Sequence, residues 1–135
     1  MILIDANVLI DVAVNDPVWA EWSQLRLDTA AGEDSLAIND VVYAELSVRY
    51  SRMTELDAML RQFEIDLAPT PRAALFLAGK AYQRYRTAGG VRTGVLPDFF
   101  VGAHAAVSGV RLITRDAPRF RTYFPEITLI SPERG

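Results

Sequence analysis

The chain has 135 residues, of which 50% are hydrophobic and 23% are charged. These proportions are typical of a globular protein with a buried core and exclude a disordered chain, while the absence of cysteine excludes disulfides and thiolate metal sites. The net charge of −3 argues against nucleic-acid binding unless several of the acidic side chains are gathered around a cation.

The first element predicted along the chain is a strand over residues 2–4, where three apolar residues run directly into Asp5. A short continuous apolar run is typical of a strand that is buried on both faces. Such a strand can accommodate a charge only at its end. We therefore expect Asp5 at the carboxyl edge of a central sheet, where open α/β sheets bind their ligands.

The remaining sequence alternates between helical and strand patterns. Strands are expected over 35–38, 65–68, 110–114 and 127–130, and helices over 7–11, 17–30, 41–48, 54–64, 71–85, 97–108 and 117–123. Expected N-caps are Asn7, Asp16 and Asn39 or Asp40, and glycines at 89–90 and 109 are expected to end helices. Residues 91–96 are expected to form a loop, and the last residues a short tail. The alternation predicts an α/β fold with a parallel sheet covered by helices on both faces, and 1–135 as one domain.

Four acidic residues are expected to converge on one edge of this sheet. Asp5 and Asp116 each follow an apolar strand, Asp98 begins a helix, and Glu45 lies within the first two turns of another. In right-handed strand–helix–strand units, helices start at the edge where the strands end. Taken singly, Asp98 could be a helix-dipole partner, Glu45 a surface acid and Asp116 a turn residue.

Together, four close carboxylates would repel one another unless they held a cation. Oxygen ligands without thiolate or histidine clusters favour Mg²⁺ or Mn²⁺. We interpret Asp11, Asp16 and Asp40 as surface or capping acids. His104 lies about 240° around the helix from Asp98, so it is expected at the helix surface or the edge of the core. Since no serine–histidine or lysine nucleophile is evident, the chemistry is expected to use metal-activated water.

Four segments carry a resemblance to a known family. They are Ile2-Leu3-Ile4-Asp5-Ala6-Asn7, Val42-Tyr43-Ala44-Glu45-Leu46, Pro97-Asp98-Phe99-Phe100-Val101-Gly102-Ala103-His104-Ala105 and Leu112-Ile113-Thr114-Arg115-Asp116. In this order and spacing they resemble the motifs of PIN-domain ribonucleases, and among these the VapC-type toxins of toxin–antitoxin pairs. The resemblance covers nearly the whole chain.

The resemblance implies a PIN-like three-layer α/β/α sandwich around a parallel sheet of four to five strands, and Mg²⁺- or Mn²⁺-dependent cleavage of RNA. It implies that Asp5, Glu45, Asp98 and Asp116 form the acidic quartet, with Asn7 and Thr114 as supporting polar residues. Because Lys80 is the only lysine, RNA contacts would fall to arginines, namely Arg84, Arg86, Arg92, Arg115 and Arg119. It also implies a homodimer and a cognate antitoxin protein as partners. The face with Trp19 and Trp22 is either an apolar contact surface or core.

Other functions stay open from the sequence. The main alternative is a non-catalytic RNA- or partner-binding module of the same fold, which would gain nothing from four acids without a metal. An aspartyl-nucleophile phosphatase would require a second aspartate where Asn7 stands. A related DNA flap nuclease or exonuclease would usually have more acids and a longer chain. No signal peptide or transmembrane segment is evident, so we expect no membrane association and a cytoplasmic location.

Overall fold

The structure is a computed structural model that describes residues 1–92 and 94–132. The strands are β1 (Ile2–Ile4), β2 (Leu36–Asn39), β3 (Ile65–Ala68), β4 (Arg111–Ile113) and β5 (Leu129–Ile130). The helices are α1 (Ala6–Ala13), α2 (Ala20–Ala31), α3 (Asp40–Ser47), α4 (Met53–Gln62), α5 (Arg72–Thr87), α6 (Leu96–Ser108) and α7 (Pro118–Tyr123).

The strands form one parallel sheet in the order β3-β2-β1-β4-β5. The central strand β1 pairs with β2 on one side and β4 on the other, so that Ile2 lies between Leu36 and Arg111. All three residues of β1 are buried. This confirms the prediction of a parallel sheet whose first strand is covered on both faces.

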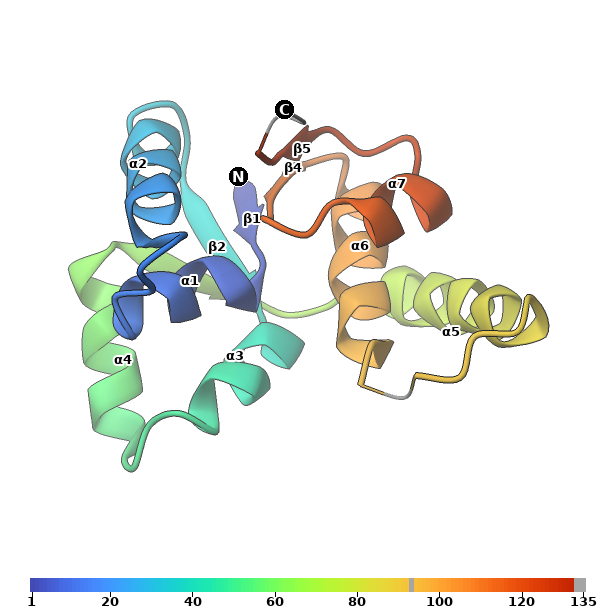
Figure 1. Cartoon of the computed structure of the whole chain (residues 1–135), viewed down its shortest axis with the longest axis horizontal. Helices are drawn as coiled ribbons and strands as arrows, with labels where there is room; N and C mark the ends of the chain where they lie inside the picture. Colours follow the sequence, from blue (N-terminus) through green and yellow to red (C-terminus); the bar gives the residue numbers. More distant parts are fainter. Residues whose placement is uncertain (93, 133–135) are drawn as a thin grey trace.

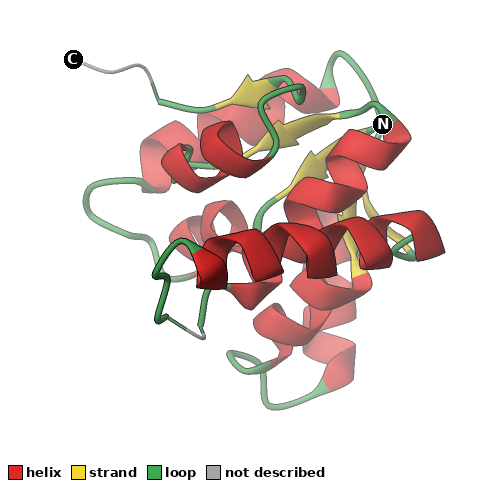
Figure 2. Cartoon of the chain, turned by 90° about the vertical axis from the view of Figure 1, so that its right-hand side faces the viewer, coloured by secondary structure: helices red, strands yellow, loops and turns green. Residues whose placement is uncertain are grey.

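Helices cover both faces of the sheet and make it a three-layer sandwich (Figures 1 and 2). The chain runs from β1 outward to β2 and β3, which places α1 to α4 on one face. It then crosses to the other side of β1 for β4 and β5, which places α5 to α7 on the opposite face. The strand order therefore reverses between β1 and β4, and ligands of such sheets bind at the carboxyl ends of the strands at this reversal.

Small and aromatic residues bring α6 and α7 close together. A Cβ atom on Gly102 of α6 would lie 2.4 Å from a ring carbon of Phe124, so only glycine fits this contact. Phe99 of α6 lies in a cluster of aromatic rings, with ring centroids 5.2 Å from Tyr123 and 5.5 Å from Tyr82. The small residues of this segment thus let α6 approach the end of α7 as well as the sheet.

Most element boundaries agree with the sequence prediction, and two helix starts do not. The Asn39 side chain caps α3 by accepting from the backbone N–H of Val42, and Gly109 ends α6 in the left-handed conformation, both as predicted. The helix expected from residue 17 begins at Ala20, because the Asp16 carboxylate accepts from two N–H groups of a preceding turn. Asn7 is not a cap, since Asp5 is the residue that precedes α1.

Two other predictions include residues that the structure does not describe. The predicted loop over 91–96 includes residue 93, and the predicted tail includes residues 133–135, all of which lie outside the described residues. Within the described residues, no helix is both long enough and apolar enough to cross a membrane.

Candidate active site

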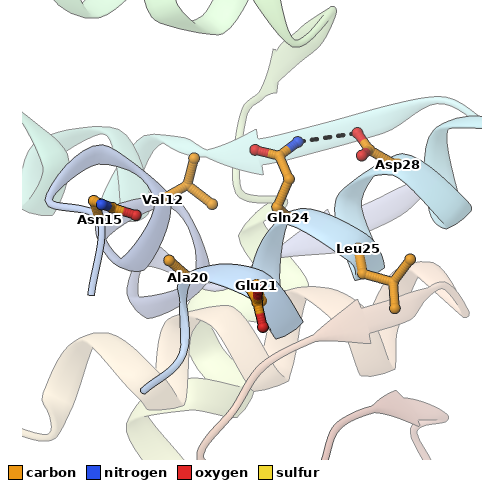
Figure 3. A pocket seen from close by; sticks show the side chains of 7 residues that line it. All are labelled: Val12, Asn15, Ala20, Glu21, Gln24, Leu25 and Asp28. Atoms are coloured by element: carbon orange, nitrogen blue, oxygen red, sulfur yellow. Dashed lines mark hydrogen bonds between the residues drawn. The ribbon is translucent and has the colours of Figure 1, made fainter. Parts of the chain in front are cut away.

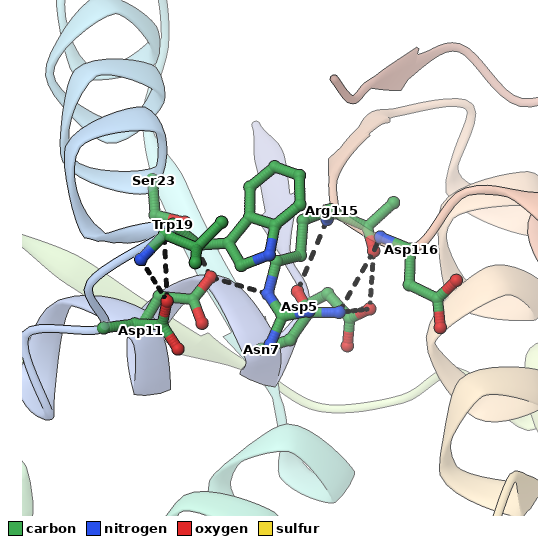
Figure 4. A network of polar contacts seen from close by, with 10 residues as sticks. Asp5, Asn7, Asp11, Trp19, Ser23, Arg115 and Asp116 are labelled. Atoms are coloured by element: carbon green, nitrogen blue, oxygen red, sulfur yellow. Dashed lines mark hydrogen bonds and ion pairs between the residues drawn. The ribbon is translucent and has the colours of Figure 1, made fainter. Parts of the chain in front are cut away.

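Asp5 lies where the sheet order reverses, between the end of β1 and the start of α1. Its side chain is only 4% exposed. The Thr114 hydroxyl, just beyond β4, donates to Asp5 Oδ2 at 2.8 Å, and the Asn7 amide donates to the same oxygen at 3.3 Å. These contacts, drawn in Figure 4, fix one oxygen of a buried carboxylate from two segments that are far apart in the sequence.

Thr114 also orders the loop that follows β4. The backbone N–H of Asp116 donates to the Thr114 hydroxyl oxygen at 3.1 Å, and the backbone N–H of Arg115 reaches Asn7 Oδ1 at 3.5 Å (Figure 4). The hydroxyl is thus both donor to Asp5 and acceptor from the loop. Asn7 and Thr114 therefore lie beside Asp5 and hold its carboxylate and the loop in place.

The carboxyl groups of Glu45 and Asp98 lie close enough to Asp5 for their charges to affect its pKa. Burial, followed by the charges of Asp98 and Glu45, raises the pKa of Asp5 from 3.8 to about 7. Burial together with the charge of Asp98 raises the pKa of Glu45 to about 7. The carboxyl groups of Asp5 after β1, Glu45 of α3 and Asp98 of α6 are therefore close enough to oppose one another's ionisation. This is expected where helices start at the edge at which the strands end.

Asp116 lies at the outer side of this region. Its side chain is exposed, in contrast to Asp5, and points away from the Asp5 network in Figure 4. Its charge nevertheless contributes to the raised pKa of Asp98, for which burial is the main cause. Asp116 therefore lies close enough to Asp98 to affect its pKa, but it is not packed among Asp5, Glu45 and Asp98.

An arginine already contacts one of these acids. Arg119 Nη1 of α7 donates to Asp98 Oδ2 in an ion pair in which both side chains are partly buried. The Arg119 charge is the largest influence that lowers the pKa of Asp98, although burial prevails and the pKa remains raised. The carboxylate in the first turn of α6 is thus paired with a cationic side chain of the same protein.

The expectation that Asp11 is a surface or capping acid is wrong. Asp11 is 1% exposed, and its Oδ2 accepts from the Ser23 hydroxyl at 2.9 Å and from Arg115 Nε at 2.8 Å. The Arg115 guanidinium also lies 5.6 Å from the centre of the Trp19 ring. This network, seen in Figure 4, joins α1, α2 and the loop after β4. Its sequence signal was the spacing of four between Asn7 and Asp11, which places both on one face of α1.

Two other acids interpreted as capping residues do serve local roles. Asp16 accepts from the backbone N–H groups of Val18 and Trp19, and these bonds lower its pKa. Asp40 begins α3 and accepts from the hydroxyl and the backbone N–H of Thr70. Neither residue contacts the carboxyl groups of Asp5, Glu45 or Asp98.

His104 is core and does not lie at the helix surface. It is 2% exposed, and its Nδ1 has no hydrogen-bond partner among the described residues. Burial lowers its pKa, and the charge of Asp40 opposes this. The histidine is thus an interior side chain of α6 on a different face from Asp98.

The predicted RNA-binding arginines fall into two groups. Arg115 and Arg119 are engaged in the intramolecular ion pairs described above. Arg84 and Arg86 are exposed in the last turn of α5, and Arg92 is exposed in the following loop. The charge of Arg92 reaches Asp98 and helps to lower its pKa. All three of these side chains are exposed to solvent, and of the three only the charge of Arg92 is felt at the carboxyl region.

The carboxyl groups fit a divalent cation in chemistry but do not surround one in this conformation. Within residues 1–92 and 94–132, no three His, Asp or Glu side chains are arranged as a metal site. Glu45 Oε1 is buried without a hydrogen-bond partner among the described residues, and the pKa values of Glu45 itself and of Asp5 are raised to about 7. A buried oxygen without a donor and mutually repelling carboxylates are the features that a bound Mg²⁺ or Mn²⁺ would satisfy.

A well-formed hollow of the surface lies outside the carboxyl region. A depression of about 410 Å³ between α1 and α2 is shown in Figure 3. Its lining residues are Val12, Asn15, Ala20, Glu21, Gln24, Leu25 and Asp28. Gln24 donates to Asp28 at 3.0 Å, so these two polar side chains already satisfy each other. The depression has no part in the carboxyl region.

Comparisons with known proteins agree on one family. The model of the PIN domain family matches residues 2–123. VapBC2 from Rickettsia felis, solved with a promoter DNA fragment, has a TM-score of 0.73 at 18% identity over 98% of this chain and 100% of that chain. A toxin–antitoxin complex from Klebsiella pneumoniae has a TM-score of 0.71 at 20% identity over 100% of both chains.

A third structure, VapBC-1 from nontypeable Haemophilus influenzae, has a TM-score of 0.71 at 18% identity over 97% of this chain and 98% of that chain. A search of curated proteins finds no match. At these identities the solved structures show a shared fold, which is the predicted PIN-like sandwich.

Proposed function

The chain belongs to the PIN domain family, a family of nucleases, and on this premise we propose that it is a metal-dependent endoribonuclease that acts as the VapC-type toxin of a toxin–antitoxin pair. Of the three solved structures named above, the Klebsiella pneumoniae structure is a toxin–antitoxin complex and the other two are VapBC structures, which supports this assignment. In this proposal residues 1–135 form one nuclease domain built on the single parallel sheet.

One observation carries the catalytic part of the proposal. The ionisation of Asp5 is opposed by burial and by the charges of Asp98 and Glu45, so carboxyl groups from three separate elements share one region. Such an arrangement costs folding free energy in the absence of a cation, and proteins retain such costs chiefly where function requires them. Surface or capping acids would not be brought together in this way.

We assign the residues of this site as follows. Asp5, Glu45 and Asp98 would hold Mg²⁺ or Mn²⁺, with Asp116 as a ligand from the rim. When bound, such an ion lowers the pKa of a water molecule and stabilises charge on the phosphate. Thr114 and Asn7 keep Asp5 oriented through their hydrogen bonds to its Oδ2.

RNA binding is assigned to five arginines, of which Arg92, Arg115 and Arg119 lie closest to the proposed site. Arg84, Arg86 and Arg92 are exposed and free to contact phosphates, for which the planar guanidinium is well suited. Arg115 and Arg119 would contribute only after release from Asp11 and Asp98. A cognate antitoxin and a second copy of the chain complete the proposed set of partners.

Cleavage of RNA in Mn²⁺ or Mg²⁺, compared with EDTA, tests the proposal. We expect cleavage by the wild-type chain, its loss in EDTA, and a loss of about 10³-fold or more in Asp98→Asn, because a ligand is removed from the reacting centre. Asp66→Asn is the matched control, since it removes the same charge from an exposed position of β3.

Two outcomes would contradict the proposal. Full activity of Asp98→Asn at the same metal concentration would remove Asp98 from the site. RNA binding without cleavage in either metal would instead identify the chain as a non-catalytic binding module of this fold.

A further inference from the structure

Among the described residues, Asp98 is the one proposed metal ligand that forms an ion pair with a cationic side chain. Arg119 Nη1 donates to Asp98 Oδ2, and the two side chains are 19% and 26% exposed. Water is partly excluded from this pair, which makes it stronger than an ion pair on the open surface. One carboxylate oxygen of this proposed ligand is therefore already paired with a guanidinium.

Asp5 and Glu45, whose pKa values are both raised to about 7, have different contacts. Asp5 accepts hydrogen bonds from neutral groups, the Thr114 hydroxyl and the Asn7 amide. Glu45 Oε1 has no partner among the described residues. Arg119 thus supplies positive charge to a group of acids that would otherwise repel one another.

We propose that Arg119 is a built-in counter-ion that occupies Asp98 before metal binding and must leave Asp98 for the divalent ion to bind. This inference rests on the proposed nuclease function. It accounts for two facts together: the carboxyl groups share one region, yet no three His, Asp or Glu side chains of the described residues are arranged as a metal site. Arg119 thereby sets the metal concentration at which the site fills.

Only the side chain of Arg119 has to move. Helix α7 is fixed against α6 by the close contact of Gly102 with Phe124 and by the packing of Phe99 on Tyr123. The arginine side chain has several rotatable bonds and lies at the rim of the carboxyl region, so it can leave Asp98 without displacing the helix. Its released guanidinium then becomes a donor for an RNA phosphate beside the carboxylates.

A titration with Mn²⁺ in the absence of RNA tests the proposal, with isothermal calorimetry as the readout. We expect Arg119→Gln to bind Mn²⁺ about three- to tenfold more tightly than wild type, because the competing cation is gone. Arg121→Gln is the matched control, because it removes the same charge from the same helix. The Arg121 side chain donates a hydrogen bond to Ser131 and forms no ion pair among the described residues. The Mn²⁺ affinity of Arg121→Gln should equal that of wild type.

A second variant, Arg119→Lys, keeps the charge and distinguishes competition from a loss of structure. It should bind Mn²⁺ with an affinity between those of wild type and Arg119→Gln. Melting temperatures in EDTA check that each variant folds.

Each result has a separate meaning. Tighter binding by Arg119→Gln but not by Arg121→Gln supports the counter-ion. Equal binding by Arg119→Gln overturns the proposal, because Arg119 would then have no influence on the metal. Weaker binding also overturns it and makes Arg119 a residue that helps Asp98 to hold the metal. If neither wild type nor Arg119→Gln binds Mn²⁺, the proposed metal-dependent function itself is rejected.

Discussion

Replacement of Asp5 by asparagine should abolish metal-dependent cleavage and at the same time stabilise the metal-free protein. In the folded state, burial and the charges of Asp98 and Glu45 raise the pKa of Asp5 from 3.8 to about 7. A carboxyl group with this difference between unfolded and folded states lowers folding stability by roughly 4 kcal/mol once it is ionised in both. Asparagine carries no charge and avoids this cost.

The net gain should be smaller than the full cost. The asparagine oxygen can accept the same bonds from Thr114 and Asn7, but its buried NH₂ group needs new partners, at a cost of about 1–2 kcal/mol. We therefore expect Asp5→Asn to be about 2 kcal/mol more stable than wild type at about pH 8 in EDTA.

The pH dependence identifies the cause. The raised pKa means that the folded protein holds a proton on Asp5 which the unfolded chain has lost, so the stability linked to this group falls as the pH rises from about 4 to about 7. Below about pH 4 the carboxyl is protonated in both states. The stability difference between Asp5→Asn and wild type should therefore grow across this range and level off above about pH 7.

Urea unfolding in EDTA at several pH values measures this difference directly. A stability difference that is constant between about pH 4 and pH 8 would refute the argument, because it would show that Asp5 titrates alike in both states. A variant less stable than wild type throughout the range would mean that the hydrogen bonds of Asp5, rather than its charge, dominate.

Three further predictions follow from other contacts. Arg115→Gln should lower stability by about 2–3 kcal/mol in urea unfolding, because it leaves the buried Asp11 carboxylate without its cation, and a change below about 0.5 kcal/mol would contradict this role. Gly102→Ala should cost about 1–3 kcal/mol by the same measurement, since the new Cβ would lie 2.4 Å from the Phe124 ring; wild-type stability would show that the ring moves freely. Apparent Mn²⁺ affinity, measured by calorimetry, should rise with pH up to about 7, because Asp5 and Glu45, with pKa values raised to about 7, must lose their protons to bind metal. Equal affinity at about pH 5.5 and pH 8 would exclude the two residues as ligands.

The sequence predicted the part of the site that depends on strand ends and helix starts. Asp5 follows a strand that is apolar throughout, and Thr114 follows the strand that lies beside it in the sheet. Parallel topology alone then brings the two residues to one edge. The same reasoning placed Asp98 at the start of a helix directed toward that edge, and the structure has it in the first turn of α6.

The contacts that the sequence did not predict depend on how helices dock and how long side chains reach. Asp11 looked like a surface acid because its partners, Ser23 and Arg115, lie 12 and 104 residues away, and neither follows a local pattern. The pair between Arg119 and Asp98 similarly requires the packing of α7 on α6. Helix starts were misplaced where a polar side chain satisfied a turn instead, as Asp16 does.

The bond between Thr114 and Asp5 joins residues 109 positions apart in the chain. On the ribosome, the first residues of this protein leave the exit tunnel long before the strand that must lie beside them has been made. A nascent or truncated chain that stops short of residue 114 therefore lacks one wall of the proposed site. Under the proposed function, activity therefore cannot appear before the segment that follows β4 has been translated and has folded beside β1.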